Sequence, residues 1–546
     1  MRDQAAEPVW LADLETPAAY PLDSGTAAAI RRIDTHISHV FLTAGRAYKL
    51  RRPVRLSFLD FSDPAERLAD CLREVALNRR LAPDVYLGIA PVLEAKGGEQ
   101  RVEMGPVADT PSGDPRAIEH AVVMRRLAEG RDLKSMLERG EVTTAHLDRV
   151  AAHLARFHKA HSLGRPAPFG ADEWLAVTTG PARANVDALA TCPPDLAPPA
   201  DLEEARRLAA AFLDARRDDF DRRRRDGRIV DGHGDLHSEH VWFESDASQP
   251  LMVDCLEFRD DFRRIDAASD VSFLAMDLAY RGRADFAALF LRRYARAGGD
   301  YHLFSVVDYF LSYRALVRAK VASLVATDAT LAEAQRGHAR ESVRRHLELG
   351  LGYLRNLGER GPGRLVLTCG TIGTGKSTVA EALADACGGV VISSDRVRRD
   401  DASAAAGAAP AAYGHKRYSE AARAAVYERL LEEARHVVVS GRVAILDATF
   451  SRRAWRDLAA EHARRLGSEA ALVEVAAPKD EVIERLTARA AAGHDASEAG
   501  PGLYDAMQAE FEAPDEWPLE RRARIDTASA DWTADVVAAA RRLGIQ

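Results

Sequence analysis

The chain has 546 residues, of which 47% are hydrophobic and 29% are charged, so it can form about two to four domains with cores of their own. Its net charge of -8 argues against a general affinity for nucleic acid or for an anionic membrane, because such partners are bound by cationic surfaces. The five cysteines lack the CxxC spacing of a zinc site and are too sparse for a disulfide framework, which indicates reduced thiols in a reducing compartment.

The N-terminal residues have none of the features of a secretory signal. The segment MRDQAAEPVWLADLETP is acidic and contains proline, whereas a signal peptide needs a basic start followed by an apolar run. Nowhere does the sequence reach the roughly 18 consecutive apolar residues that a membrane-spanning helix needs. We therefore expect a cytoplasmic protein without a membrane partner, in which residues 1–30 are a variable lead-in.

From residue 31 onward the hydrophobic pattern predicts a mixture of strands and helices. Apolar and polar residues alternate in VFLTAGRAYKL, which predicts a hairpin about Ala44-Gly45, and residues 64–82 have the periodicity of a helix. A strand-like run ends at Met124, and a proline-rich loop at 191–202 interrupts the helices that follow. Another strand pair and long amphipathic helices complete a first domain, which we place at residues 31–355.

Charged residues of this first domain occur in an order that suits phosphate chemistry. Lys49 lies on a predicted strand and Glu74 on the next predicted helix, a pair that can hold the α- and β-phosphates of a nucleotide. The loop segment HGDLH, residues 233–237, offers Asp235 as a candidate base, and Asp254 ends a later apolar strand, where a metal-binding carboxylate is expected. Each feature alone also fits a surface lysine, a helix cap or an ion pair, and only their order indicates a site.

Together these residues resemble the aminoglycoside-phosphotransferase family, the small-molecule relatives of protein kinases, over about residues 30 to 350. The resemblance implies a protein-kinase-like fold in which Asp235 is the catalytic base and Asp254 binds Mg²⁺. It also implies that the segment AVVMRRLAEG forms the hinge, where backbone groups of Met124 and Arg125 meet the adenine of ATP.

The sequence departs from that family in two places. The family motif HGDLHxxN ends in a metal-binding asparagine, and His240 occupies this metal-ligand position here. Imidazole is a poorer Mg²⁺ ligand than an amide oxygen, because Mg²⁺ prefers hard oxygen donors, and Glu257 is a further candidate oxygen donor. The glycine-rich phosphate loop is missing as well, and residues 35–39 (THISH) stand in its place. Whether this half is catalytic therefore stays open at this point.

A linker and a second domain follow. The segment 356–363, NLGERGPG, has the composition of a linker, and beyond it strands and helices alternate, which indicates a parallel sheet over residues 364–546. After the first strand, GTIGTGKS matches G-x-x-x-x-G-K-[ST] and runs into a helix. The expected nucleotide-binding residues are Gly370, Thr371, Ile372, Gly373, Thr374, Gly375, Lys376, Ser377 and Thr378.

The chemistry of this loop explains its residue types. Glycines let successive amide groups turn inward around phosphate oxygens at the positive end of the following helix. Lys376 is expected to reach the β- and γ-phosphates, and the hydroxyl of Ser377 is expected to bind Mg²⁺. A chance Lys-Ser after a glycine-rich turn is the alternative, and the flanking strand and helix argue against it.

Further charged residues complete this second predicted site. Asp447 ends an apolar strand, where a carboxylate can bind Mg²⁺, and Asp395 follows another short strand, where it can orient or deprotonate a substrate hydroxyl. Both aspartates also fit helix caps. Arg485 and Arg489 are spaced i, i+4 on one helical face, which suits a lid over the nucleotide, although a solvated helix face has the same spacing.

The motifs GTIGTGKST, SSDRVRR, ILDATF and RLTAR resemble the gluconate-kinase, chloramphenicol-phosphotransferase and zeta-toxin branch of P-loop kinases, over about Arg364 to Gln546. The resemblance implies that Asp395 is the substrate-side acid and that Arg485 and Arg489 lie in the lid. The whole chain thus resembles bacterial two-part proteins that join an aminoglycoside-phosphotransferase-like domain to a P-loop kinase domain.

We therefore predict a protein of α/β and α+β class, a kinase-like fold followed by a parallel-sheet P-loop domain. The predicted activity is ATP- and Mg²⁺-dependent transfer of a phosphoryl group to a hydroxyl group of a small molecule. A nucleotide-binding regulator with a pseudokinase N-terminal half and a polynucleotide-end kinase are the alternatives. The arginine run at 222–225 is flanked by acidic residues, so it is expected to be a solvated helix end and not a nucleic-acid site.

Overall fold

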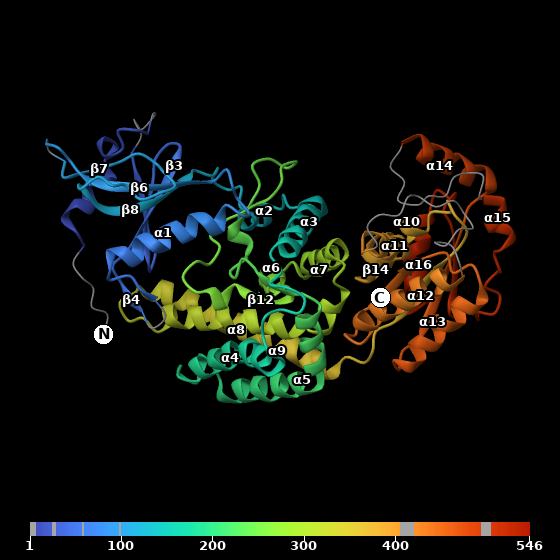
Figure 1. Cartoon of the computed structure of the whole chain (residues 1–546). Coiled ribbons are helices and arrows are strands. Elements are labelled where there is room, and N and C mark those ends of the chain that lie inside the picture. The colour runs from blue at the N-terminus through green and yellow to red at the C-terminus, as the bar shows by residue number, and fades with distance from the viewer. Residues whose placement is uncertain are drawn as a thin grey trace. The chain divides into compact units, whose positions relative to one another are not determined.

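The computed structural model describes residues 7–23, 29–56, 59–97, 100–404, 420–492 and 504–545, and the chain divides into two compact units. The first unit combines Met1–Phe169 with Arg224–Leu278, and the second combines Gly170–Arg223 with Ala279–Gln546. Each unit has its own large sheet (Figure 1). The chain therefore passes from the first unit to the second twice.

The first unit is built on a six-stranded antiparallel sheet in the order β1-β2-β3-β8-β6-β7. Its strands are β1 Arg31–Asp34, β2 Ser38–Leu42, β3 Arg46–Arg51, β6 Tyr86–Glu94, β7 Val102–Met104 and β8 Ala117–Arg125, and a short hairpin after β3 consists of β4 Arg55–Leu56 and β5 Leu59–Asp60. The hairpin predicted about Ala44-Gly45 joins β2 to β3, with Leu42 opposite Ala47. Because alternate side chains on a strand share a face, Lys49 and Arg51 of β3 project from the same side.

Helix α1, Pro64–Asn78, covers one face of this sheet. Its residue Cys71 packs in one buried cluster with Val122 of β8. The helix begins where the side chain of Asp63 accepts a hydrogen bond of 2.8 Å from the amide of Ala65, as an N-cap residue does. This start places Glu74 in the part of α1 that faces the sheet, where its side chain is fully buried.

N-terminal residues cover the opposite face. Ala121 and Val123, the neighbours of Val122 on β8, point to this side and pack in one cluster with Leu11 and Leu14. The two leucines lie on the 3-10 helix η1, which spans Val9–Glu15 and is followed by η2, Pro17–Ala19. The described part of the predicted lead-in therefore contributes to the core of the first unit.

Short elements complete the first unit. They are α2 Leu133–Glu138, α3 Thr144–Ala160, β9 Ile229–Asp231, η3 Ser238–His240, β10 Val241–Trp242, β11 Leu251–Met252, η4 Asp260–Phe262, β12 Arg264–Asp266 and α6 Ala267–Tyr280. Strand β9 pairs with β12 and β10 pairs with β11, both antiparallel. The HGDLH loop leaves β9, and Asp254 follows β11, so these small pairs set the positions of both segments.

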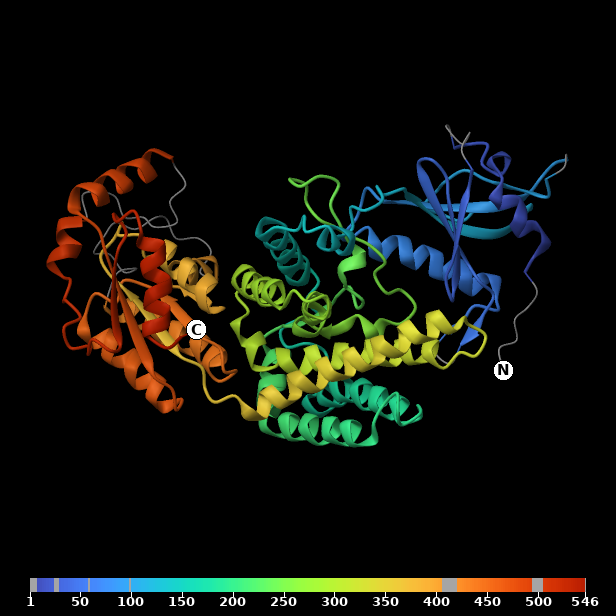
Figure 2. The ribbon, with the colours of Figure 1, turned by 180° about the vertical axis from the view of Figure 1, so that it is seen from behind.

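The second unit begins with long helices. They are α4 Ala171–Leu189, α5 Pro199–Arg225, α7 Ala284–Gly298, η5 Tyr301–Ser305, α8 Val307–Ala326 and α9 Glu333–Glu359. Figures 1 and 2 show α8 and α9 side by side, and Leu316 and Leu347 lie in their shared core. The proline-rich loop predicted to Leu202 ends where α5 begins, and the linker predicted from Asn356 is still helical as far as Glu359. Among the described helices, none combines the length and the apolar character needed to cross a membrane.

The second unit ends in a five-stranded sheet that is parallel throughout, in the order β14-β15-β13-β16-β17. Its elements are β13 Leu365–Cys369, α10 Lys376–Cys387, β14 Val390–Ser393, α11 Ser394–Ala404, α12 Glu420–Val438, β15 Ala444–Asp447, α13 Arg453–Arg465, β16 Ala470–Ala476, α14 Lys479–Ala492, α15 Tyr504–Ala509, β17 Arg522–Asp526 and α16 Trp532–Arg542. Every residue of the central strand β13 is buried, as expected for a parallel sheet covered on both faces. The parallel sheet predicted from the alternation of strands and helices is confirmed.

Candidate active sites

The glycine-rich loop of the second unit connects β13 to α10. Helix α10 begins at Lys376, directly after Gly375, which has a φ of 89°. At Gly373, with a φ of 76°, an added Cβ atom would lie 2.7 Å from Cγ1 of Val482. Both positions favour glycine, because residues that carry a Cβ atom rarely adopt such a positive φ. The loop thus meets α10 at its N-terminus, where helix amides attract anions.

Lys376 and Ser377 open this helix and point to different partners. Nζ of Lys376 donates a hydrogen bond of 2.6 Å to the carbonyl oxygen of Thr371, so the ammonium group lies over the loop. Burial lowers the pKa of Lys376, and the charge of Asp447 opposes that shift. Burial also raises the pKa of Asp447 above its usual range. A phosphate group bound here would face the amides at the start of α10 and the ammonium group of Lys376.

The hydroxyl of Ser377 donates a hydrogen bond of 2.8 Å to Oδ2 of Asp447, which ends β15. A hydroxyl and a carboxylate are hard oxygen donors, which are the ligands that Mg²⁺ prefers. These two side chains fit Mg²⁺, and the sequence predicted both of them as its ligands.

Asp395 lies beside this loop, in the first turn of α11. It is a helical residue and not the cap of a helix that starts at Arg396, because α11 begins at Ser394. Its carboxylate is partly exposed and forms an ion pair of 2.8 Å with Arg398. Its charge also raises the pKa of Lys376, against the larger effect of burial, so the carboxylate acts on the lysine electrostatically.

The two predicted lid arginines differ in their contacts. Arg485 of α14 donates hydrogen bonds to the hydroxyl of Thr527 (2.8 Å) and to its carbonyl oxygen (3.1 Å). Thr527 in turn donates a hydrogen bond of 2.9 Å to the carbonyl oxygen of Thr374 in the loop. Arg489 is exposed, and its charge is a minor cause that lowers the pKa of Lys376, after burial. Arg485 thus contacts the loop indirectly, through Thr527, whereas the side chain of Arg489 is exposed to solvent.

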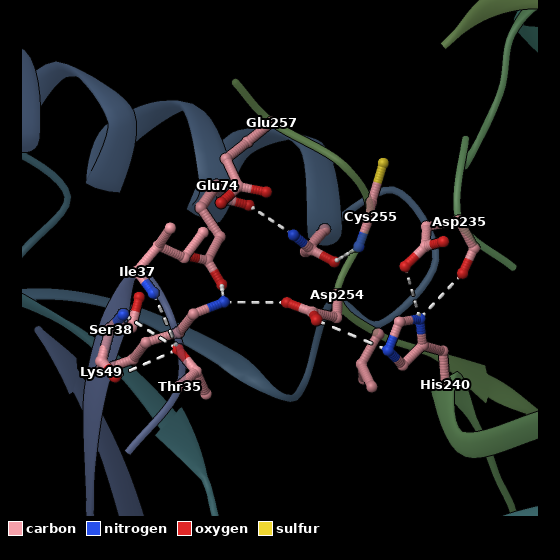
Figure 3. A network of polar contacts seen from close by, with 12 residues as sticks. Thr35, Ile37, Ser38, Lys49, Glu74, Asp235, His240, Asp254, Cys255 and Glu257 are labelled. Atoms are coloured by element: carbon pink, nitrogen blue, oxygen red, sulfur yellow. Dashed lines mark hydrogen bonds and ion pairs between the residues drawn. The ribbon is translucent and has the colours of Figure 1, made fainter. Parts of the chain in front are cut away.

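The second candidate site lies in the first unit, where Lys49 joins two carboxylates (Figure 3). Its Nζ is 2.9 Å from Oε1 of Glu74 and 2.8 Å from Oδ1 of Asp254. Burial opposes the charge of the ammonium, but the two carboxylates raise the pKa of Lys49 well above its usual range. The Coulombic effect of Lys49 likewise holds the pKa of Asp254 far below its usual range. The three residues that the sequence placed on separate elements therefore form one charged group.

Arg51, two residues after Lys49, extends this group into the core. Its guanidinium is fully buried and contacts three carboxylates, those of Asp70 (2.6 Å), Glu74 (2.5 Å) and Glu257 (2.7 Å). The oxygen that Glu257 was considered to supply to a metal ion is thus paired with an arginine instead.

The HGDLH loop is anchored from below by Asp270 of α6. Its carboxylate accepts hydrogen bonds from the amides of His233 (2.8 Å) and Gly234 (2.9 Å) and lies 2.9 Å from Nε2 of His158. Burial opposes its charge, but the hydrogen bond to His158 and the charge of that ring hold the pKa of Asp270 well below its usual range. The backbone that presents Asp235 is therefore fixed by a buried ionised group.

His240 lies between Asp235, the predicted base, and Asp254, the predicted metal ligand (Figure 3). Its Nδ1 is 2.8 Å from the carbonyl oxygen of Asp235, and its Nε2 is 3.5 Å from Oδ2 of Asp254. His237 lies close by, with Nε2 3.7 Å from Oδ2 of Asp235. In the motif of the resembled family this sequence position is an asparagine, whose amide offers an oxygen. An imidazole in this position does not fit Mg²⁺, which takes oxygen ligands.

The predicted hinge and phosphate loop take specific forms. Met124 lies inside the sheet, paired with Ala47 on one side and Tyr86 on the other, and the amide of Arg125 donates to the carbonyl of Val85. A cavity of about 370 Å³ lies just beyond, lined in part by Arg126, Leu127, Trp242 and Glu244. In the place of a glycine-rich loop, residues 35–38 form a tight turn in which the hydroxyl of Thr35 accepts a hydrogen bond from the amide of Ser38 (Figure 3).

Three residues of these sites escaped the sequence analysis. The sequence could have indicated Arg51, because Arg51 follows Lys49 at the spacing that puts two strand residues on one face. Asp270 and Thr527 had no such signal, since each meets its loop from an element that is distant in the sequence.

The fold and both sites define a two-domain protein in which a kinase-like domain of the aminoglycoside-phosphotransferase type precedes a P-loop kinase domain. Family models agree with this description. The model described as "Phosphotransferase enzyme family" matches residues 33–305, and the model described as "AAA domain" matches residues 365–514. The chain belongs to the phosphotransferase enzyme family, with the P-loop domain joined to it.

Relatives of the same two-domain length occur in mycobacteria. Uncharacterized proteins of Mycobacterium tuberculosis and Mycobacterium bovis are 33% identical over 485 residues, which cover 88% of this chain and 90% of theirs. Among solved structures, a gluconokinase from Sinorhizobium meliloti is similar to 34% of this chain over 95% of its own, with 23% identity and a TM-score of 0.26. A choline/ethanolamine kinase family protein from Mesorhizobium loti is similar to 63% of this chain over 98% of its own, with 14% identity and a TM-score of 0.37.

Proposed function

We propose that this protein is an ATP- and Mg²⁺-dependent phosphotransferase that phosphorylates a hydroxyl group of a small molecule, and that the P-loop site binds the ATP. The observation that carries the proposal is the contact between Ser377 and Asp447, 2.8 Å apart. It joins the start of α10 to the end of β15, so two oxygen donors for a metal ion lie directly beside the phosphate loop.

The roles of the chain's own residues follow from this arrangement. The amides of the loop and the ammonium group of Lys376 would hold the terminal phosphates, and Ser377 and Asp447 would hold Mg²⁺. When bound, Mg²⁺ supplies positive charge that neutralises the transferring phosphoryl group. Asp395 would orient the acceptor hydroxyl or take its proton, and Arg489 would add positive charge from the lid side. Arg485 would act by holding the loop through Thr527.

ATP consumption tests this proposal. The full-length protein is incubated with Mg-ATP and a panel of sugars, aminoglycosides, nucleosides and amino alcohols, and ADP release is measured. Lys376→Ala is expected to abolish the stimulated turnover, because no other described lysine lies in the loop. Lys479→Ala is the matched control, since Lys479 is an exposed lysine of α14 in an ion pair with Asp505. Full ATP turnover in the Lys376→Ala variant would show that the P-loop site is not the site of ATP hydrolysis or transfer.

The N-terminal site supports a second candidate function, nucleotide binding without transfer. In this half Lys49, paired with Glu74, would reach the α- and β-phosphates of a bound nucleotide, and Asp235 would be the candidate base. The imidazole of His240 in the metal position favours a regulatory role for this half. Two experiments separate a regulatory N-terminal half from a catalytic one. Calorimetry measures ATP binding to the full-length Lys376→Ala protein, and the acceptor panel is then repeated with the Asp235→Asn variant. Binding without any transfer that depends on Asp235 favours the regulator.

A further inference from the structure

We propose that the N-terminal site binds a divalent first-row transition-metal ion, with Nε2 of His240 and the carboxylate of Asp254 as ligands, in place of the Mg²⁺ that the fold family uses there. The proposal goes beyond the phosphotransferase function, because it holds whether or not this half transfers a phosphoryl group.

The hydrogen bond to Nδ1 of His240 decides which ring nitrogen can bind a metal ion. Nδ1 lies 2.8 Å from the backbone carbonyl oxygen of Asp235. A carbonyl oxygen only accepts, so Nδ1 carries the proton. In the neutral ring, Nε2 then carries a lone pair, and it is this nitrogen that lies 3.5 Å from Oδ2 of Asp254. Two acceptors that face each other repel, and a cation between them removes the repulsion.

The ring of His240 is held in this orientation from several sides. It packs against the ring of His237, with the centroids 3.9 Å apart, and its side chain is 15% exposed. Its backbone carbonyl accepts a hydrogen bond of 3.0 Å from the amide of Val253, one residue before Asp254. Metal-binding histidines in proteins commonly donate their other ring N–H to a backbone carbonyl, which fixes the tautomer and the ring direction. His240 shows this pattern.

Asp254 is held through its backbone and through one carboxylate oxygen. Its amide donates a hydrogen bond of 3.0 Å to the hydroxyl of Tyr86, and its φ is 60°, a backbone conformation unusual for a residue other than glycine. Lys49 holds Oδ1 at 2.8 Å, so Oδ2 is the oxygen that faces His240. Both candidate ligand atoms are thus directed before any ion arrives.

The type of the donor atoms determines the class of ion. Asp235 and His237 also approach His240, since one ligand atom of each of these three residues lies within 4.8 Å of the others, in a group that does not include Asp254. Imidazole nitrogen together with carboxylate oxygen suits first-row transition metals such as Mn²⁺, Fe²⁺ or Zn²⁺ better than Mg²⁺, whose preferred ligands are all oxygens. Replacement of the family's asparagine by His240 therefore changes the metal preference of the site.

Mn²⁺ binding followed by electron paramagnetic resonance tests the proposal on the full-length protein. All samples carry Ser377→Ala and Asp447→Asn, which remove the proposed metal ligands of the P-loop site. With His240 present, we expect saturable Mn²⁺ binding and a ¹⁴N coupling of a directly bound imidazole in the pulsed spectrum. His240→Asn, which restores the family's residue, is expected to weaken Mn²⁺ binding at least about tenfold. The same variant should make Mg²⁺ a better competitor by a similar factor.

A matched control variant and the pulsed spectrum of the protein that retains His240 decide the outcome. His338→Asn changes an exposed histidine of α9 and is expected to leave Mn²⁺ binding unchanged. Absence of imidazole coupling with His240 present overturns the proposal without reference to any variant, and so does an unchanged Mn²⁺ affinity in a folded His240→Asn protein.

Discussion

The hydroxyl of Ser377 lies 2.8 Å from Oδ2 of Asp447, and this contact joins two segments that are separated by 70 positions in the chain. Ser377 belongs to the first turn of α10, and Asp447 ends the neighbouring strand β15. The pair shows that the P-loop and the end of β15 meet at the carboxyl edge of the parallel sheet, where ligands of such sheets bind.

Asp447→Asn is expected to reduce the ATP turnover on the order of 10²-fold, because the amide keeps the shape but removes the negative charge that holds Mg²⁺. Binding of ATP measured without Mg²⁺ should change little, since the loop and Lys376 are intact. Asp526→Asn is the control, because Asp526 also ends a strand of this sheet, the edge strand β17, but is exposed. Equal losses in both variants would contradict the assignment of Asp447 to the metal ion.

Asp395→Asn is expected to lower kcat by roughly 10²-fold or more at an unchanged KM for ATP, because the acceptor hydroxyl loses its proton acceptor. Steady-state kinetics with the best acceptor of the panel measures both constants. Arg398→Gln breaks the same ion pair from the other side and serves as the control. If Asp395 acted only through that ion pair, the two variants would lose the same activity.

Arg51→Met should destabilise the first unit by about 3–5 kcal/mol, because it leaves three buried carboxylates without their common cation. Urea unfolding followed by circular dichroism measures the free energy of unfolding. Arg55→Met removes an arginine from an exposed ion pair with Asp60 and is expected to have little or no effect. A neutral Arg51 variant would show that the carboxylates find other partners or protonate.

His436 of α12 lies in a buried group with His302 and Asp219, all in the second unit. The rings of the two histidines are 4.1 Å apart, Nε2 of His302 is 2.8 Å from Asp219, and Nδ1 of His436 is 2.9 Å from the hydroxyl of Ser305. Glu432 lies 3.7 Å from Nε2 of His436. Burial, reinforced by the neighbouring ring, strongly lowers the pKa of His436, and burial lowers that of His302.

These lowered pKa values predict an acid-sensitive second unit. In the unfolded chain a histidine takes up its proton near pH 6.5, whereas the folded group resists protonation to a lower pH. The contribution of the two histidines to the free energy of unfolding is therefore fully present above about pH 6.5. It decreases as the pH falls below 6.5, by up to about 1.4 kcal/mol per pH unit for each histidine.

The measurement is the free energy of unfolding at several pH values between 7.5 and 5. His436→Gln should flatten the decline below pH 6.5, whereas His338→Gln, at an exposed position of α9, should not. A decline of the same slope in both variants would place the acid sensitivity elsewhere.

Much of the P-loop site could be predicted from the sequence because its chemistry is local. Nine consecutive residues supply the amides, the ammonium group and the hydroxyl, and their spacing directly reflects the turn of backbone into helix. The N-terminal site could be predicted only from the order of Lys49, Glu74, Asp235 and Asp254, because each of them lies on a different element. Their common position depends on how a helix packs against a sheet.

The amino-acid sequence by itself predicted a kinase-like domain followed by a P-loop kinase domain, through motifs that resemble known families, since short motifs are local properties. Only the tertiary structure decided that Arg51 binds three carboxylates, that Asp270 carries the HGDLH loop, and that the proton of His240 resides on Nδ1. These facts depend on atoms brought together by packing over long distances in the chain. A local sequence pattern does not specify the distance between side chains that are far apart in the chain. Those distances are set by the packing of side chains in the folded core.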